Sequence, residues 1–337
     1  MVNLKTNYLG LELKNPIIIG ACSLSADPKN LLKLQEAGAS AIVFKSLFEE
    51  QIQLESLEME EEMTEYNERH AEMVKLFPEL NHAGPEEHLN NLRIAKQTLS
   101  IPVIASLNAT YKVSWLDYAS QIEATGVDAI ELNFFAVPEK FDKDAYSIEN
   151  FQLDIVASMK NRIKIPVSVK LSPYYANPLN IIQKMDHAGA MGFVLFNRLF
   201  QPDINIEKEE HFTPFNLSND HDSRLALRFA GLLYGNINAN ICSNTGILTG
   251  ADVIRMLLAG SDCVQIVSTL YQNGSSIIGA MLSDIEKWMK AKNYKSIEDF
   301  KGKLSNKTIN DPFVYRRAQY IDLLLKSDSI FKKPTML

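Results

Sequence analysis

Short apolar runs alternate with longer amphipathic stretches along most of the chain. The runs are rich in valine and isoleucine and show little alternation with polar residues, which is typical of strands buried on both faces of a parallel sheet. There are eight of them: Ile17–Cys22, Ala41–Ser46, Pro102–Leu107, Ala129–Phe134, Val167–Leu171, Gly192–Asn197, Ala239–Asn244 and Cys263–Ser268.

The stretches between the runs carry helical patterns such as DPKNLLKLQEAG, and four of them end in Gly38, Gly126, Gly189 or Gly260. A glycine just past a helix permits the left-handed conformation that closes it before the next strand. Eight strand–helix units predict an α/β fold, a (β/α)8 TIM barrel in which residues 1–337 form one domain. An open doubly wound sheet is disfavoured, because no glycine-rich dinucleotide turn follows the first strand.

Two insertions, after strands 2 and 6, interrupt this pattern. Residues 49–80 are acidic and predicted to be helical, and residues 199–218 form a polar excursion. Both follow the carboxyl ends of strands, where the active sites of barrels lie, so a lid over the site is one interpretation. The acidic insertion is otherwise a surface for a basic partner or, as we favour, a solvated helical face.

The net charge and the cysteines of the chain argue against some classes of function. A net charge of −7 over 337 residues argues against a nucleic-acid partner. Cys22, Cys242 and Cys263 show no metal-ligand or CxxC spacing, so we expect free buried thiols, no metal, and a reducing cytoplasmic location. The amino terminus has no long apolar core, and we expect neither a signal peptide nor a membrane anchor.

Polar side chains stand at the carboxyl ends of several predicted strands, and in a barrel these ends meet at one mouth. They are Lys45, Ser46, Asn133, Lys170, Asn197 and Arg198. Lysine cations and amide donor–acceptor pairs suit a flat, polar, electron-rich heterocycle. A small-molecule site at the barrel mouth is therefore predicted.

The last two strands suggest a phosphate site beside it. Thr245 and Gly246 follow the seventh strand, and Val267 and Ser268 follow the eighth. These are the loops whose backbone N–H groups usually bind phosphate in a barrel. A flat ring next to a phosphate indicates FMN. Another phosphorylated ligand is a weaker alternative, against which Asn133, Lys170 and Asn197 argue.

An ordered set of segments resembles the dihydroorotate dehydrogenases, FMN-dependent barrels of pyrimidine synthesis. The segments are LKNPIIIGACSLS, AGASAIVFKS, IELNFF, IPVSVKLSPYY, GFVLFNR, SNTGILTGADVIRMLLAGSDCVQIVSTLYQNG and NYKSIEDFKGKL, and they span nearly the whole chain. The resemblance implies the following cofactor-binding residues: Ala21, Cys22, Ser23, Lys45, Ser46, Asn133, Lys170, Asn197, Thr245, Gly246, Val267 and Ser268.

The loop after strand 4 departs from the family pattern. Where the family has Asn-x-Ser-Cys-Pro-Asn or similar, the catalytic Cys or Ser falls on Ala136 and the last Asn on Pro138. A methyl group accepts no proton, so the catalytic base is unassigned. His82, in the loop implied to cover the substrate, is a weak candidate, since a surface histidine is the commoner case.

The substrate contacts implied by the resemblance are Asn81, Asn133, Asn197 and Arg198. Asn81 is only a loose counterpart of the family's substrate loop. Arg198 replaces a Thr or Ser. Its guanidinium suits a substrate carboxylate, although a pair with Glu207 or Glu209 is an alternative.

Two functions remain open on the sequence. The first is an FMN-dependent oxidoreductase that takes a hydride from dihydroorotate or a related cyclic amide. The second is a catalytically impaired FMN-binding protein with an electron-carrier or regulatory role. The resemblance also implies a homodimer. Because the chain has no cysteine cluster for an iron–sulfur centre, any such centre would lie in a separate electron-transfer partner.

Overall fold

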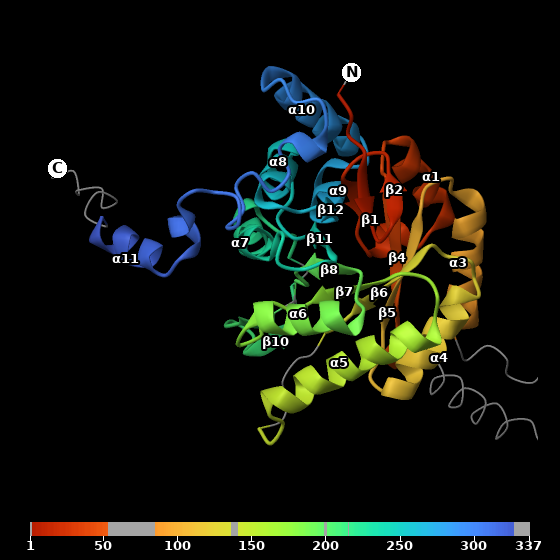
Figure 1. Cartoon of the computed structure of the whole chain (residues 1–337). Helices are drawn as coiled ribbons and strands as arrows, with labels where there is room; N and C mark the ends of the chain where they lie inside the picture. Colours follow the sequence, from red (N-terminus) through yellow and green to blue (C-terminus); the bar gives the residue numbers. More distant parts are fainter. Residues whose placement is uncertain (1, 53–84, 136–140, 199–200, 215, 327–337) are drawn as a thin grey trace, which may run out of the picture.

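The computed structural model describes residues 2–52, 85–135, 141–198, 201–214 and 216–326. Each of the eight apolar runs overlaps one strand of a closed parallel barrel (Figure 1). The strands are β3 (Ile17–Ile19), β4 (Ala41–Phe48), β5 (Val103–Asn108), β6 (Ala129–Asn133), β7 (Val167–Leu171), β8 (Gly192–Leu195), β11 (Asn240–Ser243) and β12 (Cys263–Ile266). Their order around the barrel is β11-β12-β3-β4-β5-β6-β7-β8, which confirms the TIM barrel.

Helices surround the barrel, and one further helix, α11, lies apart from it (Figure 1). They are α1 (Pro28–Glu36), α3 (Glu86–Thr98), α4 (Lys112–Glu123), α5 (Ala145–Arg162), α6 (Pro178–Ala188), α7 (Ser223–Leu233), α8 (Gly250–Ala259), α9 (Ser268–Asn273), α10 (Ile277–Ala291) and α11 (Ala318–Leu325). Short 3₁₀ helices cover Ser23–Ser25, Asp220–Asp222, Ile297–Asp299 and Pro312–Tyr315. The four glycines predicted to close helices all have positive φ, between 85° and 127°, as expected.

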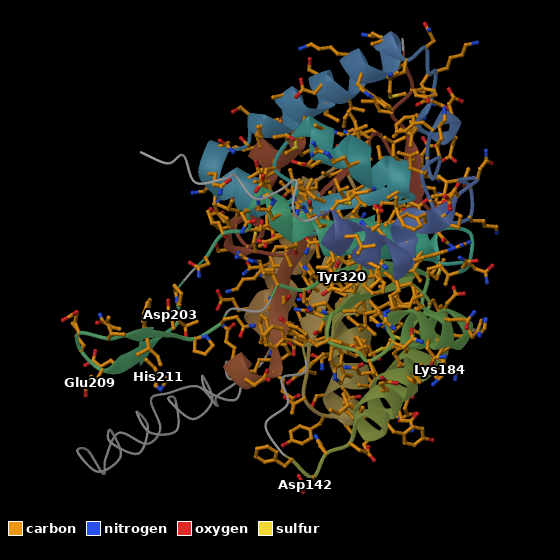
Figure 2. All side chains as sticks on the ribbon, turned by 90° about the vertical axis from the view of Figure 1, so that its left-hand side faces the viewer. Asp142, Lys184, Asp203, Glu209, His211 and Tyr320 are labelled. Carbon is orange, nitrogen blue, oxygen red and sulfur yellow. The ribbon has the colours of Figure 1, made fainter. Side chains whose placement is uncertain are left out.

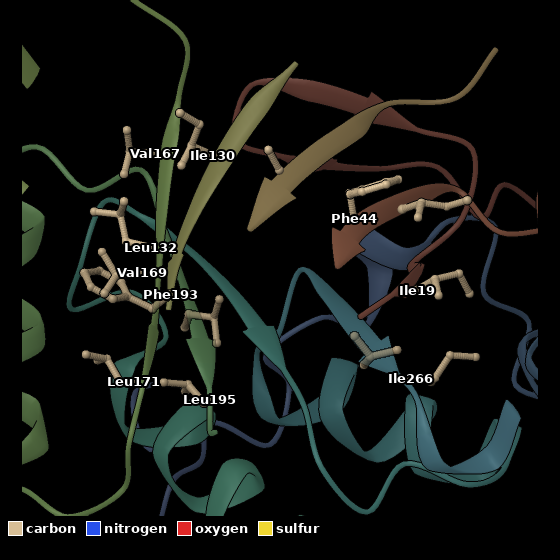
Figure 3. Close-up of a cluster of buried hydrophobic side chains, with 14 of the residues drawn as sticks. Ile19, Phe44, Ile130, Leu132, Val167, Val169, Leu171, Phe193, Leu195 and Ile266 are labelled. Atoms are coloured by element: carbon tan, nitrogen blue, oxygen red, sulfur yellow. The ribbon is translucent and has the colours of Figure 1, made fainter. Parts of the chain in front are cut away.

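Alternate residues of each strand face opposite sides, and this divides the core into two layers. Ile130, Leu132 and Phe193 belong to the larger cluster, which includes residues of the surrounding helices (Figure 3). Ile18 and Val194 belong to a smaller cluster inside the barrel. Cys242 and Cys263 are buried free thiols in that inner cluster, and Cys22 is a partly buried free thiol, as the cysteine spacing predicts.

A short antiparallel hairpin closes the amino-terminal end of the barrel. Its strands are β1 (Thr6–Tyr8) and β2 (Leu11–Leu13). Leu9 N–H donates to Asn240 Oδ1 at 2.9 Å, at the start of β11, and Tyr8 is buried in the inner cluster. The sequence pattern did not predict this hairpin. It leaves the carboxyl ends of the strands as the open mouth.

The second insertion forms a hairpin of its own. Strands β9 (Asp203–Asn205) and β10 (Glu210–Phe212) pair antiparallel. Figure 2 shows this hairpin, with Asp203, Glu209 and His211 labelled, standing out from the barrel. Most of the first insertion, residues 53–84, lies outside the described residues.

Between α10 and α11, the chain makes further contacts at Tyr315 that hold it against the barrel. Tyr315 Oη donates to Leu304 O at 2.7 Å. The Tyr315 ring packs on Gly231, where an added Cβ would lie 2.1 Å from Tyr315 Oη. From there α11 lies apart from the barrel (Figure 1), and Leu324 and Leu325 are exposed. No helix among the described residues is long and apolar enough to cross a membrane.

Candidate active site

A cavity of about 340 Å³ opens at the carboxyl ends of the barrel strands. Every residue predicted to bind the cofactor lines it: Ala21, Cys22, Ser23, Lys45, Ser46, Asn133, Lys170, Asn197, Thr245, Gly246, Val267 and Ser268. The structure therefore brings this set together, while their roles toward a ligand stay a prediction. Arg198 also lines the cavity. Asn81, His82, Ala136 and Pro138 lie outside the described residues.

The same cavity has lining residues that the sequence interpretation missed. They are Phe48, Asn216, Leu217, Ser218, Asn244, Ile247, Gln265 and Tyr271. Three of these, at 216–218, belong to the polar excursion after strand 6, so its end reaches the site although its hairpin projects away. Ser218 N–H and Oγ both donate to Ser268 Oγ, at 2.9 and 2.8 Å. This contact holds the end of the excursion against the start of α9.

The side-chain amides of Asn133 and Asn197, at the ends of β6 and β8, are hydrogen-bonded to each other. Asn197 Nδ2 donates to Asn133 Oδ1 at 2.5 Å and to Phe134 O at 3.3 Å. Asn197 N–H donates to Leu171 O at 2.7 Å, which fixes its backbone on β7. With these contacts made, Asn197 Oδ1 can accept and Asn133 Nδ2 can donate toward the cavity. The pair is therefore an ordered hydrogen-bonding edge for a flat polar ligand.

Lys170 reaches the cavity from β7 above a buried polar network. Its Nζ donates to Gln265 Oε1 at 3.5 Å, and Gln265 Nε2 donates to Glu131 Oε2 at 2.5 Å. Lys170 Nζ lies 4.0 Å from Glu131 Oε1. Burial raises the pKa of Glu131, and the Lys170 charge and the Gln265 hydrogen bond oppose that rise. Gln265 could have been predicted as a site residue from the sequence, because it is a polar residue within the apolar run CVQIV.

Arg198 does not pair with Glu207 or Glu209. Its Nε lies 3.5 Å from Asp222 Oδ2, and its Nη1 donates to Asn216 O. The hairpin that carries the two glutamates projects away from the barrel, whereas Asp222 lies at the start of α7 beside the cavity. A substrate carboxylate would share the Arg198 guanidinium with Asp222.

The loop after β11 presents unused backbone donors. Thr245 and Gly246 have φ of 73° and 70°. Within the described ranges, neither N–H donates a hydrogen bond, while the Thr245 side chain donates to Phe196 O at 3.0 Å. Free N–H groups in such a loop suit an anionic phosphate. The donors here, together with Lys170 and the amide pair, fit a phosphorylated flat ligand.

Gly246→Ala is expected to lower the free energy of unfolding by about 2–4 kcal/mol, from a positive φ and from crowding. An added Cβ would lie 2.4 Å from Ser223 N and 2.7 Å from Asn219 O, both backbone atoms. Urea unfolding would measure the loss. Gly274→Ala is the matched control, because Gly274 has a φ of 72° and nothing within 4 Å of an added Cβ. Equal losses in both variants would contradict the crowding argument.

A second cavity of about 320 Å³ adjoins the first and shares Lys45, Ser46 and Phe48 with it. His88 lines it and packs edge-on against Phe44, with ring centroids 5.3 Å apart. His88 Nε2 is buried without a hydrogen-bond partner in the described part of the chain. Burial and then the nearby Lys45 charge lower the pKa of His88 to about 4, so the imidazole is neutral at neutral pH.

Because His88 is buried and neutral, we expect the folded protein to lose stability in acid. The unfolded chain protonates His88 near the ordinary histidine pKa of 6.5, but the folded protein only near 4. The free energy of unfolding should therefore fall as the pH falls through that window, by up to about 3 kcal/mol. Urea unfolding of His88→Leu should show a smaller decline between pH 7 and 4.5. His221→Leu is the control at a side chain that is 68% exposed. An unchanged decline in His88→Leu would refute this origin.

Comparison with known proteins identifies the family of the chain. The family model described as dihydroorotate dehydrogenase matches residues 3–289. A dihydroorotate dehydrogenase B (NAD(+)) catalytic subunit of Thermoplasma acidophilum is 28% identical over 306 residues, covering 90% of this chain and 99% of the relative. The protein of the same name from Methanocaldococcus jannaschii is 27% identical over 301 residues, covering 86% and 94%. Because the family model covers residues 3–289, which include the whole closed barrel, the chain belongs to the dihydroorotate dehydrogenase family.

Proposed function

We propose that this protein is an FMN-dependent oxidoreductase that takes a hydride from dihydroorotate or a related cyclic amide in pyrimidine metabolism. The observation that carries the proposal is the cavity at the barrel mouth, which gathers the whole set of residues expected to bind FMN. Family membership supports the reaction class.

Each part of the cavity has a role in this proposal. Lys45, Lys170 and the Asn133–Asn197 pair would hold the flavin ring by charge and hydrogen bonds. Thr245 and Gly246 would donate N–H groups to the phosphate, next to Val267 and Ser268. Bound FMN supplies the hydride acceptor. Asn133, Asn197 and Arg198 would bind the substrate, with Asn81 proposed to contribute from outside the described residues.

A second candidate function is a catalytically impaired FMN-binding protein that carries electrons or regulates a partner. It is favoured by Ala136, which stands where the family has a proton acceptor. Among the described residues that line the cavity there is no histidine, aspartate or glutamate. General base catalysis contributes roughly 10²–10⁴-fold to rate, so its loss would leave binding without fast turnover.

Anaerobic addition of dihydroorotate to the purified protein separates the two functions. A yellow protein whose visible flavin absorbance bleaches rapidly would support the oxidoreductase and imply a replacement base. A yellow protein that does not bleach would support the impaired carrier or a changed substrate. A colourless protein that takes up no added FMN would contradict the cofactor assignment and both functions.

We also propose a separate electron-transfer partner. The two relatives compared above are named catalytic subunits of NAD(+)-linked enzymes. No group of three or more His, Cys, Asp or Glu side chains that could hold a metal was found within the described ranges. If the partner exists, reduced FMN in the isolated chain should be oxidised by NAD⁺ only slowly. Fast oxidation by NAD⁺ alone would contradict the proposal.

A homodimer is proposed as well, and α11 supports it. Tyr320, Leu323, Leu324 and Leu325 are each at least half exposed, which leaves an apolar helix uncovered. Sedimentation of the full chain should show a dimer, and Leu323→Glu with Leu324→Glu should shift it toward monomer. Lys292→Glu, on the exposed surface, is the control. A monomeric wild-type protein would refute the proposal.

A further inference from the structure

Glu131 differs from the other buried acids of the described chain. Glu49 accepts from Thr110 N–H and from Ser114 Oγ, and Asp252 accepts from its helix cap and from Arg255. Glu131 is 0% exposed, yet within the described ranges only its Oε2 accepts a hydrogen bond, and its Oε1 has no hydrogen-bond partner. A buried carboxyl group with an unpartnered oxygen is costly, so it calls for a physical reason.

The position of Glu131 relative to the cavity gives a physical reason for this buried carboxyl group. It lies on β6, one layer below the cavity, since Lys170 and Gln265 line the cavity and Glu131 does not. Lys170 from β7 and Gln265 from β12 face it, and Gln265 joins both by hydrogen bonds. The carboxyl group therefore contacts two side chains that line the cavity, without lining it itself.

Among the described residues, Lys170 and Tyr8 are the titratable groups that interact electrostatically with Glu131. Tyr8 comes from the hairpin that closes the barrel, and Cys242 and Cys263 lie near Tyr8. Burial raises the pKa of Tyr8 and the pKa of Cys263 well above their ordinary values, so both stay neutral near neutral pH. The electrostatic balance below the cavity thus depends on Glu131 and Lys170.

We propose that Glu131 is a positioning residue of the flavin site: it is the buried counter-charge of Lys170 and lowers the reduction potential of the bound flavin. This inference rests on the proposed function. A reduced flavin is richer in electrons than an oxidised one, so a nearby cation favours reduction and a compensating carboxylate opposes it. Gln265 holds the two charges at a fixed separation.

The reduction potential of FMN-loaded Glu131→Gln, measured against redox dyes from pH 5 to 8.5, tests this. Gln is nearly isosteric, and its amide oxygen can accept the same hydrogen bond from Gln265 Nε2. At pH 8 the ratio of reduced to oxidised flavin at a fixed potential should rise at least tenfold, a positive shift of about 30 mV for two electrons. The difference from wild type should shrink as the pH falls, because protonation neutralises Glu131 in the wild type.

Ser261→Ala is the matched control. It removes a buried hydroxyl group that bonds Ser243 Oγ at 2.6 Å, away from the cavity, and should leave the potential unchanged. If Glu131→Gln does not fold, Gln265→Met gives a second measurement. It removes the hydrogen bond that favours the ionised carboxylate, so the potential should again shift upward.

The outcomes distinguish this inference from the function on which it rests. A yellow Glu131→Gln protein with the wild-type potential at every pH would overturn the inference and leave the proposed function intact. An equal shift in Ser261→Ala would overturn it too. A wild-type chain that takes up no FMN would overturn the proposed function, and the inference with it.

Discussion

Ala136→Cys is expected to accelerate reduction of the bound flavin by dihydroorotate by roughly 10²–10⁴-fold, the usual contribution of a general base. The family resemblance places a proton acceptor at this position, and the wild-type chain has a methyl group there. Residue 136 itself lies outside the described residues, so the prediction rests on the sequence and on the rest of the cavity. Anaerobic stopped-flow absorbance would measure the rate.

The pH dependence and a matched variant identify the cause of any gain. A cysteine base acts as thiolate, so the rate should rise with pH toward about 8.5, the ordinary pKa of a thiol. Ala136→Val has a side chain of similar size without a proton acceptor and should show no gain. Adding Pro138→Asn restores the second family residue of the loop. A gain in Ala136→Val, or none in the doubly restored loop, would contradict the base argument.

A wild-type protein that already bleaches rapidly would give a different result. Ala136→Cys would then add little, because another group already takes the proton. His82→Ala would test the one candidate that the sequence offers outside the described residues. His88 is a poor alternative, because its pKa of about 4 makes its imidazole a weak base and it lines only the second cavity.

The barrel could be predicted from the sequence because its strands are buried on both faces. Strand β7, with the sequence VSVKL, shows the limits of this signal: its outward valines and leucine mark a strand, and its inward serine and lysine break the apolar run. The predicted runs also extend past some strands. Strand β3 ends at Ile19, and Ala21 and Cys22 leave the sheet to line the cavity. The hairpin β1–β2 was missed because three-residue strands carry too few apolar positions for a period.

The site could be predicted where a side chain follows directly from the end of a strand. Asn133 and Lys170 are such cases, and their strands place them side by side in register. Glu131 lies two residues before Asn133 on β6 and is in register with Ser168 of β7. Its contact with Lys170 is therefore diagonal and depends on the register of the barrel strands. The partner of Arg198 is Asp222, which lies 24 positions further along the chain, in the 3₁₀ helix before α7. Such contacts require the fold.

Lys170→Met is expected to lower the free energy of unfolding by about 3 kcal/mol at pH 8, and by much less at pH 5, because breaking a buried ion pair leaves an uncompensated charge. Glu131 is that charge, 4.0 Å from Lys170 Nζ. Burial holds the pKa of Glu131 above the ordinary value of a glutamate, and the Lys170 charge lowers it. A carboxyl group whose folded pKa is raised costs stability as the pH rises from the unfolded pKa to the folded one. Removing Lys170 raises the folded pKa further and extends that loss to higher pH.

Urea unfolding of the cofactor-free protein avoids any contribution from ligand binding. The double variant Lys170→Met with Glu131→Gln removes both charges, so it should recover most of the loss at pH 8 and depend less on pH than Lys170→Met. Lys164→Met, just before the same strand and facing solvent, is the control for loss of a lysine. If Lys170→Met were equally destabilised at pH 5 and pH 8, Glu131 would keep one protonation state over that range in both proteins, and the predicted pH dependence would be wrong. The double variant would then identify that state: no recovery at pH 8 would mean that Glu131 is neutral, and Glu131→Gln would leave the flavin potential unchanged.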